Sequence, residues 1–379
     1  MDTAVRAEAL IDLAAIRDNV AAIRRRVGTA AVMAVVKADG YGHGLVPAAR
    51  AALAGGASWL GVANVEEALT LRAVGLESPR ILSWLAAPGE RWKAALDANI
   101  DVAAYSLWQL AEIVEAAEHC DKRARVHLKI DSGLNRGGAG PSDWPALVDA
   151  ALSAEADGAI RVVGLWSHLA CADELGHPSI VRQLKAFQEA VEFAERVGIR
   201  PEVRHLANSA ATLTLPETHF DLVRPGLAVY GLSPIPDATP EQLGLTPAMT
   251  VRARFALVKR VPEGEGVSYG HRYVTSRETT LGLVPLGYAD GVPRAASNVG
   301  PVWAAGRRRT IAGTVCMDQF VLDLDDDSIA AGDEVVLFGP GTSGEPTAQD
   351  WADATGTISW EIISRIGPRV PRHYVGGGT

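Results

Sequence analysis

Lys37 stands where a lysine could react as a free amine. It directly follows the wholly apolar segment 31–36 and precedes the glycine-rich run 38–42, in which Tyr41 offers a hydroxyl. A lysine at the top of a buried strand is partly desolvated, which lowers its pKa and frees the amine to form an imine. The glycines would let the backbone pass close to a ligand. On this segment alone, a lysine that reaches the surface from a strand end is the competing interpretation.

Polar side chains also follow the other apolar runs before residue 230. In a (β/α)8 barrel the active site lies at the carboxyl ends of the strands, so these positions carry the functional information. Random strand ends would be mostly small and neutral, whereas these ends collect cations, an imidazole and hydroxyls at one rim. They are Asn64, Trp84, Tyr105, Lys129 with Asp131, His168, Asn208 with Ser209, and Arg224 with Gly226.

The last two strand ends predict a phosphate site. Barrels often bind phosphate in the loops after the seventh and eighth strands, through backbone N–H groups. Ser209 follows the seventh run, and Gly226, which allows close backbone approach, follows the eighth. Plain helix capping by Ser209 and an ordinary turn at Gly226 are the alternatives. A lysine for an imine beside a phosphate cradle suggests pyridoxal phosphate, with a Schiff-base aldolase acting on a phosphorylated sugar as the open alternative.

The elements that position these residues read as eight strand-then-helix units. Each apolar run has the length of a buried parallel strand, and helix-period stretches such as 107–117 and 181–197 lie between them. We predict a (β/α)8 barrel over residues 13–240 that binds the cofactor. A doubly wound sheet is less favoured because no GxGxxG follows the first strand. The runs are 31–36, 59–63, 80–84, 101–104, 125–130, 162–166, 203–206 and 222–229.

Beyond residue 240 the pattern changes to short alternating runs between glycines and prolines. Only 348–354 and 358–366 have a helical period, so residues 241–379 are predicted to form a mostly β domain. Residues 1–12 precede the first barrel strand and could pair with this domain instead. The strand-like runs are 249–261, 279–285, 310–324 and 334–338.

Composition excludes several classes of protein. The 379 residues suggest two domains, and 36 basic against 45 acidic residues, a net charge of −9, argue against a nucleic-acid partner. No apolar run reaches the roughly 20 residues that span a bilayer. The arginine runs 24–26 and 307–309 are read as solvated faces. Three cysteines without a CxxC spacing predict free thiols in a cytoplasmic protein, and no metal site is expected: Cys120, Cys171 and Cys316.

Eight segments, in order and in register across both predicted domains, resemble those of the alanine racemase family of fold-type III pyridoxal-phosphate enzymes. The resemblance implies an isomerase that interconverts L- and D-alanine and supplies D-alanine for peptidoglycan. AVVKADGYGHG and GTVCMDQ are the most specific of the eight. They are AVVKADGYGHG (34–44), LKIDSGLNRGG (128–138), SHLACAD (167–173), HLANSAA (205–211), RPGLAVYG (224–231), GVSYGHRY (266–273), LGYADGVPR (286–294) and GTVCMDQ (313–319).

The resemblance implies how the cofactor, pyridoxal 5'-phosphate, is held. Lys37 would carry it as a Schiff base, and Arg224 would face the pyridine nitrogen beside His168. Because an arginine cannot accept a proton from that nitrogen, the ring would stay unprotonated and would be a weak electron sink. The phosphate contacts implied by the family are the Tyr41 and Ser209 side chains and the amides of Gly226 and Leu227.

The resemblance also implies two bases on opposite faces of the substrate. Lys37 would serve the D-face, and Tyr269 would serve the L-face from the partner subunit of a homodimer. A free tyrosine has a pKa near about 10, so positive charge from a chain of His168, Arg224 and His205 would favour phenolate. Packing within the β domain is the alternative role for Tyr269.

Substrate and gate residues follow from the same resemblance. Arg136 and the amide of Met317 would bind the alanine carboxylate. Lys129 would carry a carbamate that orients Arg136; the alternative is an ordinary amine in an ion pair with Asp131 or another acid. Pro368 stands where some relatives place a tyrosine, and Thr314 where certain members have an arginine, which bears on access. The resemblance places Tyr288, Asp173 and Arg294 in the entrance corridor and implies that Asp318 is a supporting or gate residue.

Three alternatives remain at the level of sequence. A narrow neck excludes one extra group by only about 1–3 kcal/mol, so a racemase acting on both alanine and serine is the first. A barrel-fold decarboxylase is the second, although Arg224 disfavours it because decarboxylation profits from a protonated pyridine. A cofactor-carrier barrel without catalysis is the third, and residues 249–366 argue against it because such carriers lack a β domain.

Overall fold

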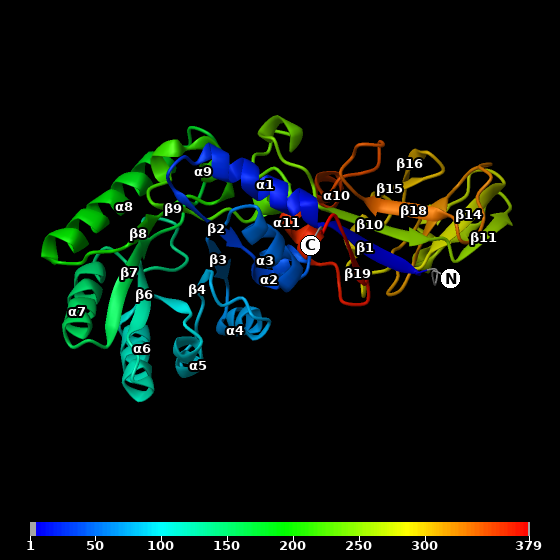
Figure 1. The fold of residues 1–379 in the computed structure, drawn as a ribbon. Coiled ribbons are helices and arrows are strands. Elements are labelled where there is room, and N and C mark those ends of the chain that lie inside the picture. Colours follow the sequence, from blue (N-terminus) through cyan, green and yellow to red (C-terminus); the bar gives the residue numbers. More distant parts are fainter. Residues whose placement is uncertain (1–4, 378–379) are drawn as a thin grey trace. The chain divides into compact units, whose positions relative to one another are not determined.

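The computed structural model describes residues 5–377, and the chain divides into two compact units that are considered separately. The barrel unit comprises residues 16–40 and 45–245, and the β unit comprises residues 5–15, 41–44 and 246–377. Long helices flank the strands of the first, whereas strands dominate the second (Figure 1). The domain boundary after residue 240 stays a prediction, and residues 1–4 and 378–379 of the predicted β domain lie outside the described residues.

All eight apolar runs before residue 230 contain a strand of one parallel sheet. Its order is β8-β7-β6-β5-β4-β3-β2-β9, so β9 returns to lie beside β2. Backbone bonds from Asp221 N to Arg204 O (3.1 Å) and from Arg224 N to Ala207 O (2.9 Å) join the remaining edges. The predicted barrel is therefore confirmed. Its strands are β2 (Ala31–Val35), β3 (Trp59–Val62), β4 (Arg80–Ser83), β5 (Asp101–Ala104), β6 (Ala124–Lys129), β7 (Ile160–Trp166), β8 (Val203–His205) and β9 (Leu222–Val223).

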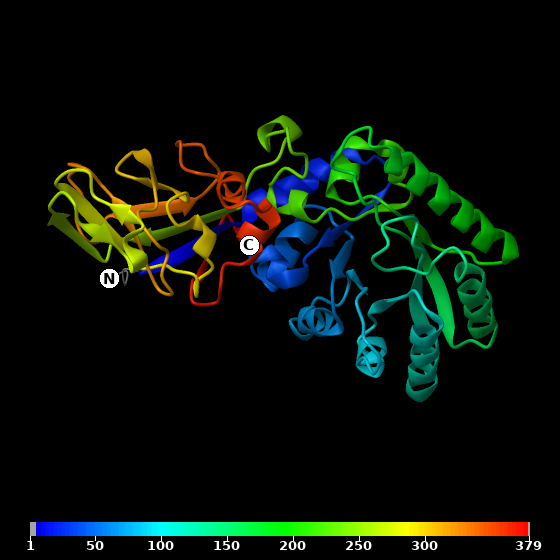
Figure 2. The same ribbon diagram turned by 180° about the vertical axis from the view of Figure 1, so that it is seen from behind.

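Helices connect successive strands and lie along the outer side of the sheet (Figure 2). In the longest, the apolar residues Phe187, Ala190 and Ala194 recur three or four apart and are buried. A proline in its first turn and Gly198 beyond its last set its two ends. The helices are α1 (Leu13–Arg26), α2 (Lys37–Tyr41), α3 (Leu45–Ala54), α4 (Val65–Ala73), α5 (Trp92–Asp97), α6 (Leu107–Cys120), α7 (Trp144–Ala156), α8 (Pro178–Val197), α9 (Ser209–Thr214), η1 (Pro216–Thr218), η2 (Leu227–Tyr230) and η3 (Glu241–Leu243).

The eighth predicted strand is much shorter than its apolar run. We predicted 222–229, but β9 ends at Val223 and the 3-10 helix η2 follows. Pro225 has no N–H to donate to a neighbouring strand, so beyond β9 only its carbonyl continues the contact with β2, accepting from Val35 N at 3.0 Å. The apolar residues after it are buried in η2, which explains why the pattern alone was misleading.

The β unit is built on a six-stranded sheet of order β16-β15-β18-β10-β1-β19. The amino-terminal strand β1 pairs antiparallel with β10 and parallel with β19. A three-stranded sheet β11-β14-β17 and a hairpin β12-β13 complete it. Its elements are β1 (Ala7–Asp12), β10 (Met249–Arg254), β11 (Leu257–Val261), β12 (Gly266–Val267), η4 (Tyr269–His271), β13 (Tyr273–Val274), β14 (Thr279–Val284), η5 (Arg294–Ala296), β15 (Pro301–Ala304), β16 (Arg307–Thr310), β17 (Phe320–Asp323), β18 (Glu334–Phe338), α10 (Ala348–Thr355), α11 (Ser359–Ser364) and β19 (Arg372–Val375).

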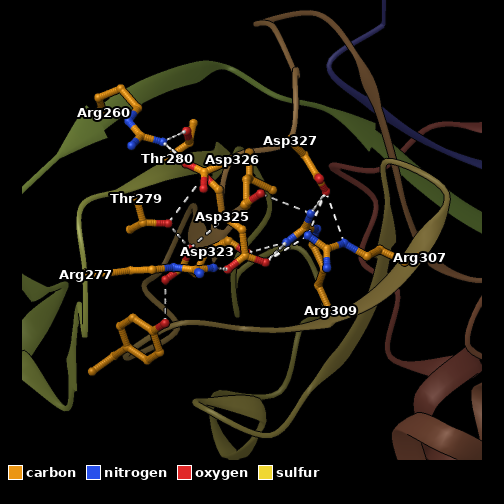
Figure 3. A network of polar contacts seen from close by, with 12 residues as sticks. Arg260, Arg277, Thr279, Thr280, Arg307, Arg309, Asp323, Asp325, Asp326 and Asp327 are labelled. Carbon is orange, nitrogen blue, oxygen red and sulfur yellow. Dashed lines mark hydrogen bonds and ion pairs between the residues drawn. The ribbon is translucent and has the colours of Figure 1, made fainter. Parts of the chain in front are cut away.

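The sequence patterns were wrong at one hairpin of the β unit. The run 310–324 holds the strand β17 and only the last residue of β16, and the hairpin β15–β16 was missed because Arg307–Thr310 is cationic. Arg309 is also no solvated side chain, since it is buried and pairs with Asp325 (3.4 Å) and Asp327. Figure 3 shows these arginines among the carboxylates of the loop after β17, which explains how a basic strand is accommodated.

Two further features concern the class of protein. No helix within residues 5–377 is long and apolar enough to cross a membrane. The thiols of Cys120, Cys171 and Cys316 are free.

A cluster of buried apolar side chains fills the centre of the barrel, and it consists of Met33, Trp59, Leu82, Ala103, Trp166 and Leu222.

Candidate active site

The segment after Lys37 is a turn of left-handed backbone. Ala38, Asp39, Gly40 and Tyr41 have φ values of 54°, 53°, 61° and 53°. For residues other than glycine this conformation costs roughly 1–2 kcal/mol each, so the surroundings must hold it in place. This left-handed turn therefore fixes the point at which Lys37 leaves β2.

Glu67 on α4 is the residue that holds this turn. One carboxylate oxygen accepts from Ala38 N at 2.6 Å and the other from Ala63 N at 2.9 Å, so the carboxylate bridges the ends of β2 and β3. Farther along the turn, Asp39 accepts from Leu45 N at 2.7 Å. Sequence reasoning missed Glu67. Its only signal was the spacing from Asn64, which caps α4, and that spacing indicates a helix start rather than a loop anchor.

The surroundings of Lys37 favour the neutral form of its amine. Burial lowers its pKa, the nearby charge of Arg136 lowers it further, and Glu67 partly opposes both. A lysine with a lowered pKa is a better nucleophile and proton acceptor at neutral pH. The amine also lies 5.9 Å from the centre of the Trp84 ring.

Arg224, directly after β9, is buried and held by neutral groups. One guanidinium nitrogen donates to His205 Nδ1 at 3.0 Å, and the other donates to Ser167 O at 2.7 Å and lies 3.2 Å from His168 Nδ1. Burial lowers the pKa of Arg224 to about 9, which still leaves it cationic at neutral pH. Trp166 lies beneath the guanidinium, with its ring centre at 4.9 Å.

The two histidines beside Arg224 are held neutral. Burial lowers the pKa of His168 and of His205 well below its usual value, and the charge of Arg224 lowers both further. Because the guanidinium can only donate, each imidazole accepts at Nδ1. The predicted grouping of these three side chains is what the structure shows.

Lys129, the last residue of β6, is a buried amine among cations. Burial, followed by the charges of Arg224 and Arg136, lowers its pKa to about 8. The amine lies 4.6 Å from the centre of the Trp166 ring. The alternative pairing with Asp131 is not seen within 4.0 Å, and one Asp131 oxygen instead accepts from three successive amides of the loop 133–135.

Ser209 lies at the first position of α9 and connects the two predicted phosphate loops. Its Oγ accepts from Gly226 N at 2.8 Å and from Ala228 N at 3.3 Å. The cap of α9 is Asn208, which accepts from Ala211 N at 3.1 Å, so Ser209 is not the capping residue. The loops after β8 and β9 therefore converge on one hydroxyl, with Leu227 buried beside them.

Other predicted residues lie in the β unit. Tyr269 in η4 is 75% exposed, and Met317 is 53% exposed. Thr314 Oγ1 donates to the carbonyl of Tyr269 at 2.8 Å, and Ala289 N donates to the carbonyl of Met317 at 3.0 Å. Thr314 thus anchors the backbone that presents the Tyr269 phenol, while the phenol itself is open to solvent.

The predicted gate residues are exposed or half-buried. Tyr288 is exposed, and its amide donates to Cys316 O at 3.0 Å, which joins the segments that carry Tyr288 and Met317. Asp318 pairs with Arg369 at 2.8 Å, next to the exposed Pro368. Arg294 begins η5 and is exposed, Asp173 in the barrel unit is half-buried, and Arg136 is exposed.

Tyr41 belongs to the β unit, and burial raises its pKa. Residues 5–377 contain no cluster of metal-binding side chains.

Comparison with known proteins gives matches along nearly the whole chain. The family described as "Alanine racemase, N-terminal domain" matches residues 11–234, and "Alanine racemase, C-terminal domain" matches residues 248–374. An alanine racemase of Frankia casuarinae is 61% identical over 372 residues, covering 98% of this chain and 97% of the relative. One of Streptomyces coelicolor is 60% identical, covering 99% of this chain and 97% of the relative.

Solved structures agree. The alanine racemase from D-cycloserine-producing Streptomyces lavendulae superposes with a TM-score of 0.98 at 58% identity, covering 99% of this chain and 98% of that one. The enzyme from Streptomyces coelicolor A3(2) superposes with a TM-score of 0.97 at 60% identity, covering 98% of both chains. These matches extend over both units, and none of the relatives named here is an aldolase, a decarboxylase or a carrier without a β domain.

Proposed function

The chain belongs to the alanine racemase family, an isomerase family acting on a small amino acid, and we propose that it interconverts L- and D-alanine with Lys37 and Tyr269 as opposed bases. The observation that supports this role most directly is a half-buried lysine at the end of β2, followed by a turn that Glu67 anchors and with a pKa lowered by its surroundings. D-alanine made in this way would serve peptidoglycan synthesis.

The residues of the barrel unit fit pyridoxal phosphate. The charges of Lys37, Lys129, Arg136 and Arg224 lower the pKa values of neighbouring lysines and histidines, so the region favours an anion. When bound, the cofactor supplies an electron sink that makes the α-hydrogen of alanine acidic. Its proposed ligands within this unit are Lys37, His168, Ser209, Arg224 and the amides of Gly226 and Leu227.

Arg224 and Tyr41 would act on the cofactor as hydrogen-bond donors. Arg224 stays cationic at neutral pH and has no lone pair to take up a proton, so it would leave the ring nitrogen unprotonated. Tyr41 keeps its proton because burial raises its pKa, and it can therefore donate to a phosphate oxygen.

Lys37 would move the proton on the D-face. Its lowered pKa increases the fraction of neutral amine, the form that can accept a proton and return it. Glu67 fixes the backbone on which that amine stands. Together they would supply one of the two bases and the geometry that aims it.

Tyr269 would serve the L-face of a second subunit's site. It is exposed in the single chain, and Met317, whose amide would bind substrate carboxylate beside Arg136, is exposed as well. Three large apolar side chains are also exposed at the carboxyl end of the barrel strands: Leu85, Leu107 and Leu175. Such a rim favours cover by another protein surface, and we propose a homodimer with shared active sites.

Lys129 would carry a carbamate that orients Arg136. Carbamate formation needs a neutral amine, and a pKa near 8 makes that form accessible at physiological pH. Its negative charge would partly neutralise the surrounding cations.

We also propose a cytoplasmic location, which agrees with the three free thiols. A domain boundary near residue 240 remains part of the proposal.

A second candidate activity is a racemase for both alanine and serine. Pro368, exposed where some relatives place a tyrosine, favours a wider neck. A chiral assay of both amino acids with added cofactor separates the two candidates. Comparable turnover of serine would replace the alanine-specific proposal.

The two-base assignment is tested by Tyr269→Ala. Exchange of the α-hydrogen of D-alanine with solvent should persist, because Lys37 still serves that face, while exchange from L-alanine should fall by at least about 100-fold. Lys37→Ala is the reference that should lose both. Equal loss from both enantiomers in the Tyr269 variant would contradict the assignment.

A further inference from the structure

A continuous chain of polar contacts runs through the interior of the barrel from Arg224 to Asp101. Arg224 Nη1 lies 3.0 Å from His205 Nδ1, and His205 Nε2 lies 2.9 Å from His127 Nδ1. His127 Nε2 then lies 3.4 Å from Asp101 Oδ2, while Arg125 Nε donates to the other Asp101 oxygen at 3.0 Å. Every nitrogen of both imidazoles therefore has a partner.

The chain crosses the barrel from one end to the other. Asp101 is the first residue of β5, at the amino end of the parallel strands, whereas Arg224 follows β9 at the carboxyl end. His127 in β6 and His205 at the end of β8 lie between them, and all four side chains are buried. Barrel interiors are usually filled by branched apolar residues, so two imidazoles here need a reason.

Hydrogen-bonding capacity fixes the direction of the chain. The Arg224 guanidinium only donates, so His205 Nδ1 accepts and a neutral His205 carries its proton on Nε2. That proton points at His127 Nδ1, which must accept, so a neutral His127 carries its own proton on Nε2, facing Asp101. An ionised carboxylate only accepts, and the requirements from the two ends agree.

The space for this chain is built into the backbone. A Cβ on Gly164 of β7 would lie 2.0 Å from His127 Nδ1, so only glycine fits beside the imidazole. The β6–β7 register shifts between Val126 and His127. The ring of Trp166 stacks on His205 at 5.5 Å and 7°, and Trp59 meets His127 edge-on at 5.6 Å.

Arg224 has no carboxylate of its own. Its hydrogen-bond partners within residues 5–377 are two imidazoles and two backbone carbonyl groups. The buried carboxylate of Asp101 lies at the far end of the imidazole chain, and polarisation through hydrogen-bonded groups is effective in a low-dielectric interior. Asp101 is thus the acid that this chain of contacts links to the guanidinium, and its other oxygen pairs with Arg125.

We propose that Asp101 and His127 are positioning residues for Arg224: they fix the tautomer of His205, so that the guanidinium is held as a cationic donor toward the cofactor ring. This inference rests on the proposed role of Arg224 in the reaction. Asp101 would act from the amino end of the barrel, far along the strands from the residues that contact substrate. The competing role for both residues is purely structural, as part of a satisfied buried network.

The variant Asp101→Asn makes a directional prediction. Arg125 requires an acceptor, so the Asn oxygen turns to it and the amide NH2 faces His127 Nε2. His127 must then move its proton to Nδ1, which obliges His205 to do the same. The chain ends in two donors facing each other at Arg224 and His205. A loss of about tenfold in kcat, with little change in KM, is expected from one hydrogen bond to a charged group.

The readout is 15N NMR of the purified holoenzyme labelled in its histidine imidazoles, with signals identified by His127→Gln and His205→Gln. The wild-type protein should show protonated Nε2 and bare Nδ1 at both residues. In Asp101→Asn, protonated Nδ1 should appear at one or both. A protonated Nδ1 at His205 in the wild type, or unchanged imidazole signals in the variant, would overturn the proposal.

Glu202→Gln is the matched control. Glu202 also accepts from Arg125, at 3.0 Å and 3.3 Å, but it touches neither imidazole. It should leave the 15N signals and kcat unchanged; a tautomer change equal to that of Asp101→Asn would show a general effect and refute the specific one. If the wild-type signals are as expected but no racemase activity is found, the hydrogen-bond chain stands and the proposed function fails instead.

Discussion

At the scale of single residues, the candidate site contains two lysines, Lys37 and Lys129, whose pKa values are lowered chiefly by burial. Lys129 has a folded pKa near 8 against a usual value of 10.5. Between about pH 8 and pH 10.5 the Lys129 amine binds more protons in the unfolded chain than in the folded one. Lys129 therefore makes the free energy of unfolding rise with pH over that range. Below pH 8 the buried charge is a cost that an apolar side chain would not incur.

The corresponding variant is Lys129→Met, compared with the wild type after removal of the cofactor and in carbonate-free buffer. The stability of the variant relative to the wild type should be higher at pH 7 than at pH 10.5, by about 1–3 kcal/mol. Denaturant unfolding at the two pH values measures the difference. A relative stability that does not change with pH would mean that Lys129 titrates normally in the folded protein.

At the scale of elements, the left-handed turn after β2 depends on one carboxylate. In Glu67→Gln the side chain keeps one acceptor but presents an NH2 to either Ala38 N or Ala63 N, so one backbone amide loses its hydrogen bond to a charged acceptor. We expect a loss of about 1–3 kcal/mol in the free energy of unfolding and faster dissociation of the cofactor.

Glu66→Gln on the same helix is the matched control, since its side chain is exposed. Denaturant titration and the rate of cofactor release, followed by absorbance, should leave this control at wild-type values. Equal effects of the two substitutions would point to helix charge rather than to the turn.

The elements also show why sequence patterns predicted some features and not others. Buried parallel strands are continuously apolar, so all eight barrel strands and the residues at their ends could be found. The length of β9 could not, because the apolar residues after Pro225 fill a 3-10 helix equally well. Glu67 was missed because its contact with Ala38 spans 29 residues, and Arg309 was misjudged because its acids lie on another loop.

At the scale of the whole molecule, a single chain exposes the group proposed as its second base. Tyr269 is 75% exposed, so in the single chain its phenol faces solvent. The proposed remedy is a second copy of the chain, which would bring Tyr269 to the cation-rich barrel of its partner. Each subunit would then contribute Lys37 to one site and Tyr269 to the other.

This arrangement is tested by mixing two inactive proteins, Lys37→Ala and Tyr269→Ala, under conditions that allow subunits to exchange. In a mixed dimer one site carries both lesions and the other carries neither. With random exchange half of the dimers are mixed, so activity should recover to about a quarter of the wild-type value. Lys37→Ala exchanged with itself is the control. If both bases of a site came from the same subunit, every site in the mixture would lack one of them, and no recovery at any mixing ratio would refute the shared site.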